Sequence, residues 1–108
     1  MSKYNNRKTT VNGIIFDSDA EARRYRELCL LARAGEITNL KLQPQFTLLE
    51  GFKTPDGETV RPTVYRADFS YMENGKLVVE DVKGVRTEAY KLKYKLMLER
   101  HGIRVTEI

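Results

Sequence analysis

Asp68, Asp81 and Lys83 are the residues of this 108-residue sequence whose types and spacing could do chemistry together. They flank Asn74-Gly75, a strong signal for a two-residue hairpin turn. Such a turn sets Asp68 directly opposite Asp81, and the alternation of side chains along a strand puts Lys83 on the same face. Like charges that face each other across two strands are destabilising. The pattern is reasonable where a divalent cation lies between the carboxylates, because Mg²⁺ and Mn²⁺ take oxygen ligands.

Lys83 adds a cation beside this carboxylate pair, where a phosphate oxygen or an attacking water would lie. The three residues together indicate metal-assisted hydrolysis of a phosphodiester, in which the metal acts as a Lewis acid and activates water. Two alternatives stay open at this point. The charges could form a solvated face with a weak surface pair, and a three-residue loop would set Asp68 against Glu80 instead.

The composition fits one soluble domain over residues 1–108, with 41% hydrophobic and 31% charged residues. No apolar run is long enough to span a bilayer and the N-terminus lacks a signal-peptide pattern, so no membrane partner is expected. The single cysteine, Cys29, excludes an internal disulfide and favours an intracellular setting. One His and one Cys cannot build a zinc site, so any metal must be held by oxygen. The net charge of +4 favours a polyanionic partner.

The N-terminal residues 1–10 are polar and basic, and we expect them to form a flexible arm in which Lys3, Arg7 and Lys8 could touch phosphates. A frayed terminus is an equally good interpretation of the same residues. Directly after this arm, Asn12-Gly13 predicts a small hairpin that leads into the first helix.

The first helix is predicted to begin at Ser18, because Ser18-Asp19-Ala20-Glu21 has the form of a capping box, and to end at Gly35. Its core-facing stripe begins with Glu21, and its far side carries several arginines. The stripe comprises Glu21, Tyr25, Leu28 and Ala32, and the far side Arg23, Arg26 and Arg33. Glu21 therefore has two interpretations, as a cap residue or as a further carboxylate for the metal.

The middle of the chain is expected to be extended over residues 36–50, with Pro44 marking a strand start or an edge. Gln43 and Gln45 flank this proline and could reach a ligand. Residues 51–59 are rich in turn formers and predict an exposed loop with Pro55-Asp56-Gly57 at its tip.

The second helix is predicted from about Glu88 to Arg100, with Thr87 as its cap and Gly102 as its stop. One apolar face comprises Tyr90, Tyr94, Met97 and Leu98, and a second comprises Ala89, Leu92 and Leu96, so we expect the helix to be covered on both sides. Lys91 and Lys95 share the polar strip between these faces and could contact a nucleic-acid backbone, while Lys93 projects elsewhere.

The chain ends in an alternating strand over residues 103–108, which completes the order helix, three strands, helix, strand. The last strand-helix-strand unit should be a right-handed crossover that places the final strand parallel to the third. The sequence therefore predicts an α/β fold with a mixed sheet flanked by helices.

This order and these residues resemble the PD-(D/E)XK nuclease superfamily, and within it small phage-borne proteins related to Holliday-junction resolvases and to the transposon end-cleaving endonuclease. The (D/E)-x-K motif corresponds to Asp81-Val82-Lys83, the metal-binding aspartate to Asp68 and the first-helix carboxylate to Glu21. Gln43 matches a position where related nucleases often carry a glutamine. One departure is Ala67-Asp68, which stands where the name of the superfamily has Pro-Asp.

The resemblance implies an αβββαβ restriction-endonuclease-like core and a Mg²⁺- or Mn²⁺-dependent DNA endonuclease. Its substrates would be DNA, such as branched, recombination or replication intermediates of a phage, in the cytoplasm of a bacterial host cell. Asp68, Asp81 and Glu21 would hold one or two ions, with the Val82 carbonyl as a further ligand, and Lys83 would position the attacking water. Residues expected to bind the DNA are Gln43, Arg66, Arg86, Lys91 and Lys95. No small-molecule cofactor is expected, and a homodimer would let one small site cut two strands.

Two other functions compete with hydrolysis. A catalytically inactive DNA-binding module of the same fold would retain DNA without nicking it. An assembly protein could instead use the second helix as an interface and would have no affinity for DNA. Neither function needs the facing carboxylates.

Overall fold

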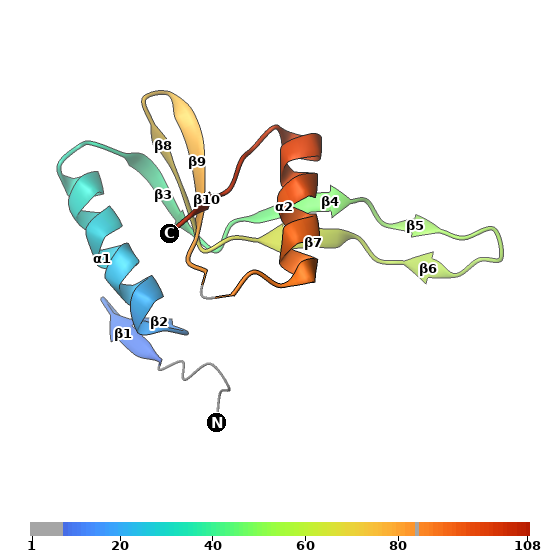
Figure 1. Cartoon of the computed structure of the whole chain (residues 1–108), viewed down its shortest axis with the longest axis horizontal. Coiled ribbons are helices and arrows are strands. Elements are labelled where there is room, and N and C mark those ends of the chain that lie inside the picture. The colour runs from blue at the N-terminus through green and yellow to red at the C-terminus, as the bar shows by residue number, and fades with distance from the viewer. Residues whose placement is uncertain (1–7, 84) are drawn as a thin grey trace.

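A four-stranded mixed sheet forms the centre of the computed structural model, which describes residues 8–83 and 85–108 (Figure 1). Its strand order is β10 (Thr106–Glu107), β9 (Lys76–Asp81), β8 (Phe69–Glu73) and β3 (Thr38–Leu42). Neighbours β3, β8 and β9 run antiparallel, and β10 runs parallel to β9. The predicted parallel placement of the final strand is therefore confirmed.

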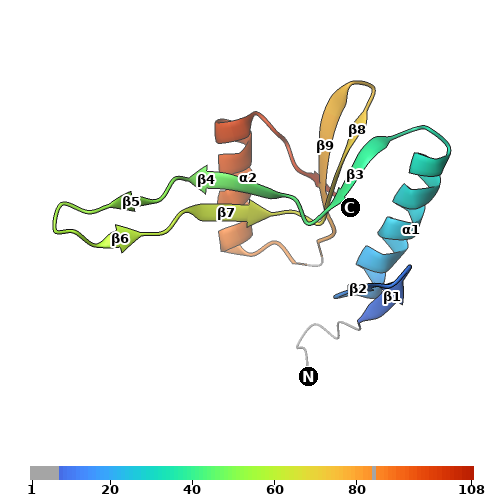
Figure 2. The same cartoon turned by 180° about the vertical axis from the view of Figure 1, so that it is seen from behind.

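Two helices cover opposite faces of this sheet, α1 (Asp19–Arg33) on one and α2 (Glu88–His101) on the other (Figures 1 and 2). The buried cluster on the α1 face comprises Phe16, Ala22, Leu28, Ile37, Phe69 and Tyr71. The cluster on the α2 face comprises Leu48, Tyr65, Ala67, Val79, Tyr90, Met97 and Val105. Alternation along β8 and β9 supplies both clusters, so the chain is a mixed α/β protein.

Both helices begin and end close to the predicted residues. The Ser18 hydroxyl caps α1 by accepting the Glu21 backbone N–H at 3.1 Å, and Thr87 caps α2 in the same way through Tyr90. Gly35 and Gly102 follow the helices with φ of +81° and +66°, which glycine adopts without the steric penalty of a Cβ. The three arginines on the far side of α1 are exposed, as predicted.

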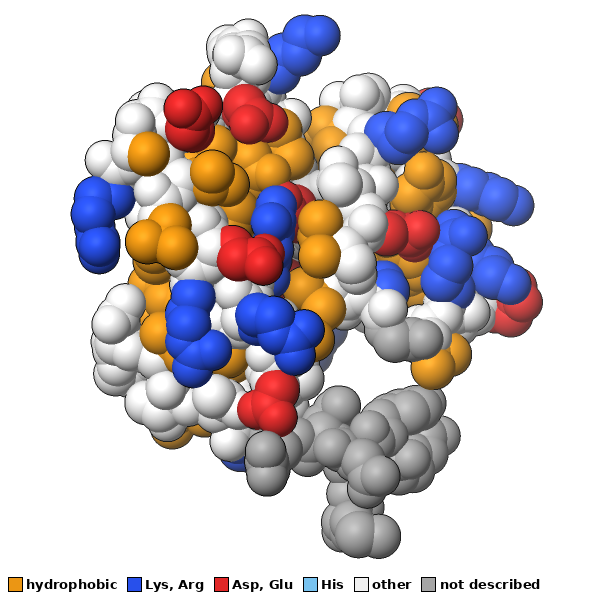
Figure 3. All heavy atoms as spheres, turned by 60° about the vertical axis from the view of Figure 1, so that its left-hand side comes forward, with side chains coloured by type: hydrophobic (Ala, Val, Ile, Leu, Met, Phe, Trp, Pro, Cys, Tyr) orange, Lys and Arg blue, Asp and Glu red, His pale blue; other side chains and the backbone are white. Residues whose placement is uncertain are grey.

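The surface around α1 mixes charges of both signs with apolar atoms and has no large patch of one sign (Figure 3). A polyanion is attracted by a face on which positive charge predominates. The arginines of α1 therefore do not single out this side of the molecule as the nucleic-acid interface.

Helix α2 is covered on one side only, so the expectation of coverage on both sides is wrong. Its Tyr90 and Met97 are buried, but Leu92 is 58% exposed and Ala89 is also exposed. The reason is that the sheet and strand β4 (Gln45–Leu49) pack against the same side of the helix.

A bend divides the extended segment that the sequence predicted over residues 36–50. Strand β3 ends at Leu42, Gln43 takes a φ of 51°, and β4 begins after Pro44. β3 pairs with β8, whereas β4 pairs with β7 (Thr63–Arg66) in a separate two-stranded sheet. One long antiparallel pair of strands therefore changes direction midway, which local hydrophobic alternation does not reveal.

Beyond the bend, β4 and β7 continue as a projecting ribbon that includes β5 (Phe52–Lys53) and β6 (Thr59–Val60) (Figures 1 and 2). The predicted loop is thus limited to the tip around Pro55-Asp56-Gly57. The radius of gyration is 16.1 Å, larger than the roughly 13 Å of a compact domain of this length. The ribbon accounts for this elongated shape.

The N-terminal strands β1 (Thr9–Val11) and β2 (Ile14–Phe16) form the hairpin predicted at Asn12-Gly13. The expected arm over residues 1–10 is therefore too long, since Thr9 and Thr10 belong to β1. Residues 1–7, with Lys3 and Arg7, lie outside the described part of the chain. Within residues 8–83 and 85–108, neither helix has the length and apolar character needed to cross a membrane.

A buried ion pair joins α1 to the central sheet. Glu80 is 1% exposed, and Arg24 binds both of its carboxylate oxygens, through Nε at 2.8 Å and Nη2 at 2.6 Å. The Tyr71 hydroxyl also donates to Glu80. Glu80 thus lies on the opposite face of β9 from Asp81, and its pairing with Arg24 was not predicted.

We predict that Arg24→Met destabilises the protein by about 3–5 kcal/mol, because it leaves the Glu80 carboxylate buried without its counter-charge. Urea unfolding measures the change. Arg26→Met on the exposed side of the same helix is the control and should change stability by less than about 0.5 kcal/mol. Equal stability of the two variants would contradict a structural role for the pair.

Candidate functional site

The predicted hairpin register is confirmed over five strand pairs, from Glu73–Lys76 at the turn to Phe69–Glu80. Asn74 and Gly75 both have positive φ, at 53° and 77°, as a two-residue turn requires. A three-residue loop is thereby excluded.

Asp68 lies just past the last regular pair, at the bend. Its backbone N–H donates to the Glu80 carbonyl at 3.1 Å, and its carbonyl accepts from the Gln43 N–H at 2.9 Å. The predicted direct pairing of Asp68 with Asp81 is therefore absent from the strand ladder, because the bend shifts Asp68 out of register. Main-chain bonds to two neighbouring segments nevertheless fix its position.

The side chains of Asp68 and Asp81 still meet, and their carboxyl groups hydrogen-bond to each other. Burial, the hydrogen bond to Asp81 and the charge of Asp81 together raise the pKa of Asp68 to about 8. The Val82 N–H donates to Asp68 Oδ2 at 2.7 Å and acts in the opposite direction, lowering the pKa of Asp68. Asp68 therefore keeps its proton at neutral pH in the absence of a cation.

Asp81 is 3% exposed and has two further partners on one oxygen. The Tyr65 hydroxyl donates to Oδ2, and Lys83 Nζ lies 3.2 Å from the same atom. Lys83 Nζ also lies 4.2 Å from the centroid of the Tyr90 ring. The predicted proximity of Lys83 to Asp81 is thus present in the structure.

Glu21 approaches this site from the first turn of α1. Burial raises the pKa of Glu21, the charges of Asp17 and Asp81 raise it further, and Lys83 lowers it. Its interpretation as a cap residue is confirmed by two bonds to Ser18, whose hydroxyl accepts the Glu21 N–H at 3.1 Å and donates to Glu21 Oε1 at 3.4 Å. Its role as a metal ligand stays a prediction, because no three His, Cys, Asp or Glu side chains of the described residues are arranged to hold an ion.

Two converging carboxyl groups are nevertheless a suitable donor set for a hard cation. Mg²⁺ is commonly bound through one or two carboxylates and completes its shell with waters and substrate phosphates. Asp68 and Asp81 supply such a pair, and a cation between them would relieve the repulsion that now requires a proton. Ligation by the Val82 carbonyl stays a prediction, since Val82 contacts Asp68 through its N–H.

An open groove beside Lys83 carries three cations, Arg66 from β7, Lys83 itself and Lys93 from α2. Its other lining residues are Val64, Tyr65, Thr87, Ala89 and Tyr90. Arg66, predicted to bind nucleic acid, thus lines the groove beside Lys83. Lys93, which was expected to project elsewhere, is the α2 lysine that lines the groove with Lys83.

Of the remaining predicted contacts, Arg86, Lys91 and Lys95 lie in a second depression, whose other lining residues are Glu88, Leu92 and Tyr94. Arg86 pairs with Glu107 at 3.1 Å and Lys91 with Glu88 at 3.2 Å, so part of this charge is neutralised. Gln43 is exposed at the bend and touches Asp68 through its backbone.

Three residues of the site were not predicted from the sequence: Tyr65, Tyr90 and Lys93. The spacing of Tyr90 and Lys93 on one helix face was a usable signal, because residues three apart are neighbours. No comparable signal existed for Tyr65, since strand β7 was not predicted.

Comparison with known proteins gives a family but no function. The family model described as "Protein of unknown function (DUF1064)" matches residues 1–106. Among curated proteins and among solved structures, nothing matches the chain. Since the match covers nearly the whole length, the chain belongs to the DUF1064 family.

Proposed function

We propose that this protein is a metal-dependent DNA endonuclease that hydrolyses phosphodiester bonds. The observation that carries the proposal is the contact between the Asp68 and Asp81 carboxyl groups, with Lys83 Nζ 3.2 Å from Asp81 and facing a basic groove. A protein selected only to fold would avoid two touching carboxyl groups, because like charges so placed are destabilising.

Asp68 and Asp81 would hold Mg²⁺ or Mn²⁺, and Glu21 from α1 adds a further negative charge that acts on the pair. When bound, the ion supplies Lewis-acid stabilisation of the phosphate charge and makes water a better nucleophile. Binding of the ion would release the proton that Asp68 holds. Hydrogen bonds with Gln43 and Glu80 fix the backbone of Asp68, and the Val82 N–H holds its carboxyl group.

Lys83 supplies a cation at the point where negative charge develops. Its side chain is 26% exposed, so its ammonium group can reach both Asp81 and a phosphate in the groove. A donor aimed at the developing charge stabilises the transition state more than the bound substrate. Arg66 and Lys93 line the same groove and would bind the flanking phosphates.

We also propose that the fold is an αβββαβ core of the PD-(D/E)XK type, which agrees with the proposed function. Support comes from the carboxylate on α1, the bent strand pair and the parallel final strand. Ala67 in place of a proline has a local reason here, since its N–H donates to the Pro44 carbonyl at 3.1 Å. A proline has no N–H and could not make this bond. The resemblance to junction resolvases makes branched DNA the first substrate to test.

We predict that Lys83→Ala reduces the rate of DNA cleavage by about 10²- to 10³-fold, because it removes a donor that acts in the transition state. Nicking of labelled linear, branched and single-stranded DNA with Mg²⁺ or Mn²⁺ measures this. Lys76→Ala, at the exposed turn end of β9, is the matched control and should cleave normally.

Gel shifts on the same DNA separate the alternatives. Lys83→Ala should bind DNA nearly as well as the wild type, since Arg66 and Lys93 remain. Retention of DNA by the wild type without any nicking would instead indicate a DNA-binding module. Normal cleavage by Lys83→Ala would remove this residue from the mechanism.

We predict that binding of Mn²⁺ tightens as pH rises, because the ion displaces the proton held by Asp68. With a pKa of about 8, affinity should increase by up to about tenfold per pH unit between pH 6 and 8. Calorimetry in two buffers of different ionisation enthalpy measures the released proton. Asp56→Asn at the ribbon tip is the control, and Asp68→Asn should abolish the pH dependence together with most of the affinity.

The same shift predicts the stability of the metal-free protein. The folded pKa of about 8 lies above the ordinary value of 3.8, so between these values the folded chain keeps a proton that the unfolded chain releases. The contribution of Asp68 to stability is therefore present below about pH 4 and is lost as pH rises through about 8. Unfolding of the wild type and of Asp68→Asn over this pH range measures the effect. The loss of stability with rising pH should occur in the wild type and be absent from Asp68→Asn.

A further inference from the structure

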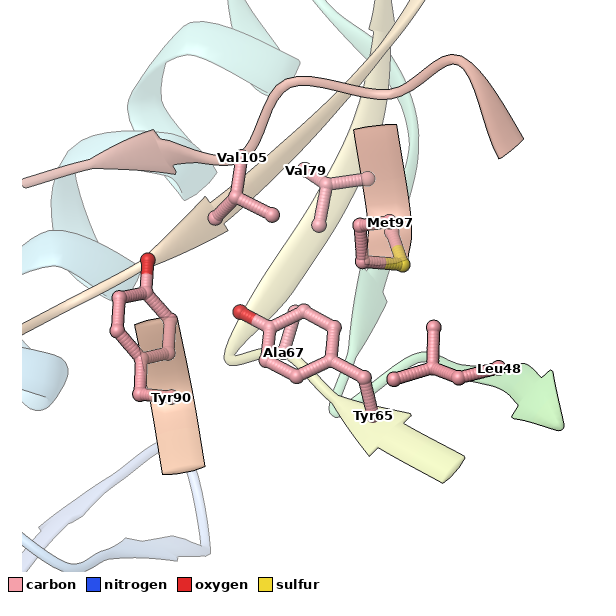
Figure 4. Packing of buried hydrophobic residues seen from close by; sticks show 7 residues of the cluster. All are labelled: Leu48, Tyr65, Ala67, Val79, Tyr90, Met97 and Val105. Carbon is pink, nitrogen blue, oxygen red and sulfur yellow. The ribbon is translucent and has the colours of Figure 1, made fainter. Parts of the chain in front are cut away.

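Two tyrosines lie between the candidate site and the α2 core. One contacts the Asp81 carboxylate of the site and the other contacts the Lys83 ammonium group. Tyr65 comes from β7, at the base of the projecting ribbon, and Tyr90 from the first turn of α2. Their ring centroids are 6.3 Å apart, and Figure 4 shows both rings within one cluster, next to Ala67. Both side chains are buried, at 3% and 6% exposure.

Tyr65 contacts the metal-binding side of the site through its hydroxyl. The hydroxyl donates to Asp81 Oδ2, the oxygen that also lies 3.2 Å from Lys83. Both contacts fall on Oδ2, so Oδ1 takes neither of them. A carboxylate held through one oxygen presents the other in a fixed direction, as the outer partners of metal ligands do.

Tyr90 contacts the cationic side of the site through its ring. Lys83 Nζ lies 4.2 Å from the ring centroid, a distance at which the ring face attracts a cation. The Tyr90 hydroxyl takes no part in this contact. It is buried, and burial together with the nearby Glu107 carboxylate raises the pKa of this hydroxyl. The hydroxyl thus lies toward Glu107, and the contact with the Lys83 ammonium is made by the ring.

We propose that Tyr65 and Tyr90 are positioning residues, Tyr65 orienting the Asp81 carboxylate through its hydroxyl and Tyr90 holding the Lys83 ammonium through its ring face. This inference rests on the proposed function and assigns separate tasks to the two residues. Tyr65 sets the geometry in which a metal is bound. Tyr90 sets the position of the cation that acts on the phosphate.

The test for Tyr65 is Tyr65→Phe, which removes one hydroxyl and keeps the ring. Calorimetry should show Mn²⁺ affinity lower by about tenfold, the usual effect of losing an outer partner of a metal ligand. Tyr71→Phe is the matched control, because the Tyr71 hydroxyl also donates to a buried carboxylate of β9, but on the α1 face. Tyr71→Phe should lose stability without any loss of Mn²⁺ affinity. Equal Mn²⁺ affinity of wild type and Tyr65→Phe would overturn this half of the inference.

The test for Tyr90 compares Tyr90→Phe with Tyr90→Leu. Tyr90→Phe keeps the ring face and should cleave DNA like the wild type, whereas Tyr90→Leu should lose about tenfold in kcat with KM unchanged. Proton NMR of the wild type gives a second measurement that does not depend on folding of a variant. The ε-methylene signals of Lys83 should be shifted upfield by the ring current, and Lys76 at the exposed turn end of β9 serves as reference.

Failure of this inference is distinguishable from failure of the proposed function. A wild type that neither binds Mn²⁺ nor nicks DNA would overturn the function. A wild type that does both, with Lys83 signals at ordinary positions or with Tyr90→Leu as fast as Tyr90→Phe, would overturn the role of Tyr90 alone.

Discussion

The contact between the carboxyl groups of Asp68 and Asp81 is the constraint on which the rest of this structure depends. Two carboxyl groups touch only where a proton or a cation lies between them, so the chain must hold them together against their repulsion. Main-chain bonds do this on both sides: Asp68 is bound to Gln43 and Glu80, and the Asp81 carbonyl accepts the Ile108 N–H at 3.0 Å. Burial of two apolar clusters supplies the free energy that keeps this arrangement folded.

The bend between β3 and β4 is what connects the sheet to the site. Gln43 takes a left-handed φ of 51°, which costs a residue with a side chain on the order of 1–2 kcal/mol. The conformation persists because the neighbouring strands bond across the bend at Asp68 and Ala67. The same bend turns β7 toward α2 and brings Tyr65 against Asp81. The base of the ribbon is therefore part of the site and not an appendage to it.

Local signals in the sequence predicted the parts of this structure that short segments determine. Asn74-Gly75 set the hairpin register, Ser18 and Thr87 capped the helices, and the final strand fell parallel to β9. The strand start at Pro44 was predicted and is confirmed by β4, but the bend was missed because the alternation of apolar residues continues on both sides of Gln43. The contacts of Arg24 with Glu80 and of Tyr65 with Asp81 join residues 56 and 16 positions apart, so they depend on how whole elements pack. Such contacts define much of the site, and no local pattern encodes them.

Glu80 and Asp81 show how one strand separates a structural charge from a functional one. Both carboxylates are buried and adjacent in sequence, but they lie on opposite faces of the sheet. Glu80 receives a bidentate guanidinium and a hydroxyl, a rigid arrangement that satisfies its oxygens. Asp81 receives one hydroxyl and one ammonium on a flexible stem, and it shares its site with a second acid. The negative charge on the α1 face is therefore neutralised within the protein, whereas the α2 face retains an acidic pair that an external cation would complete.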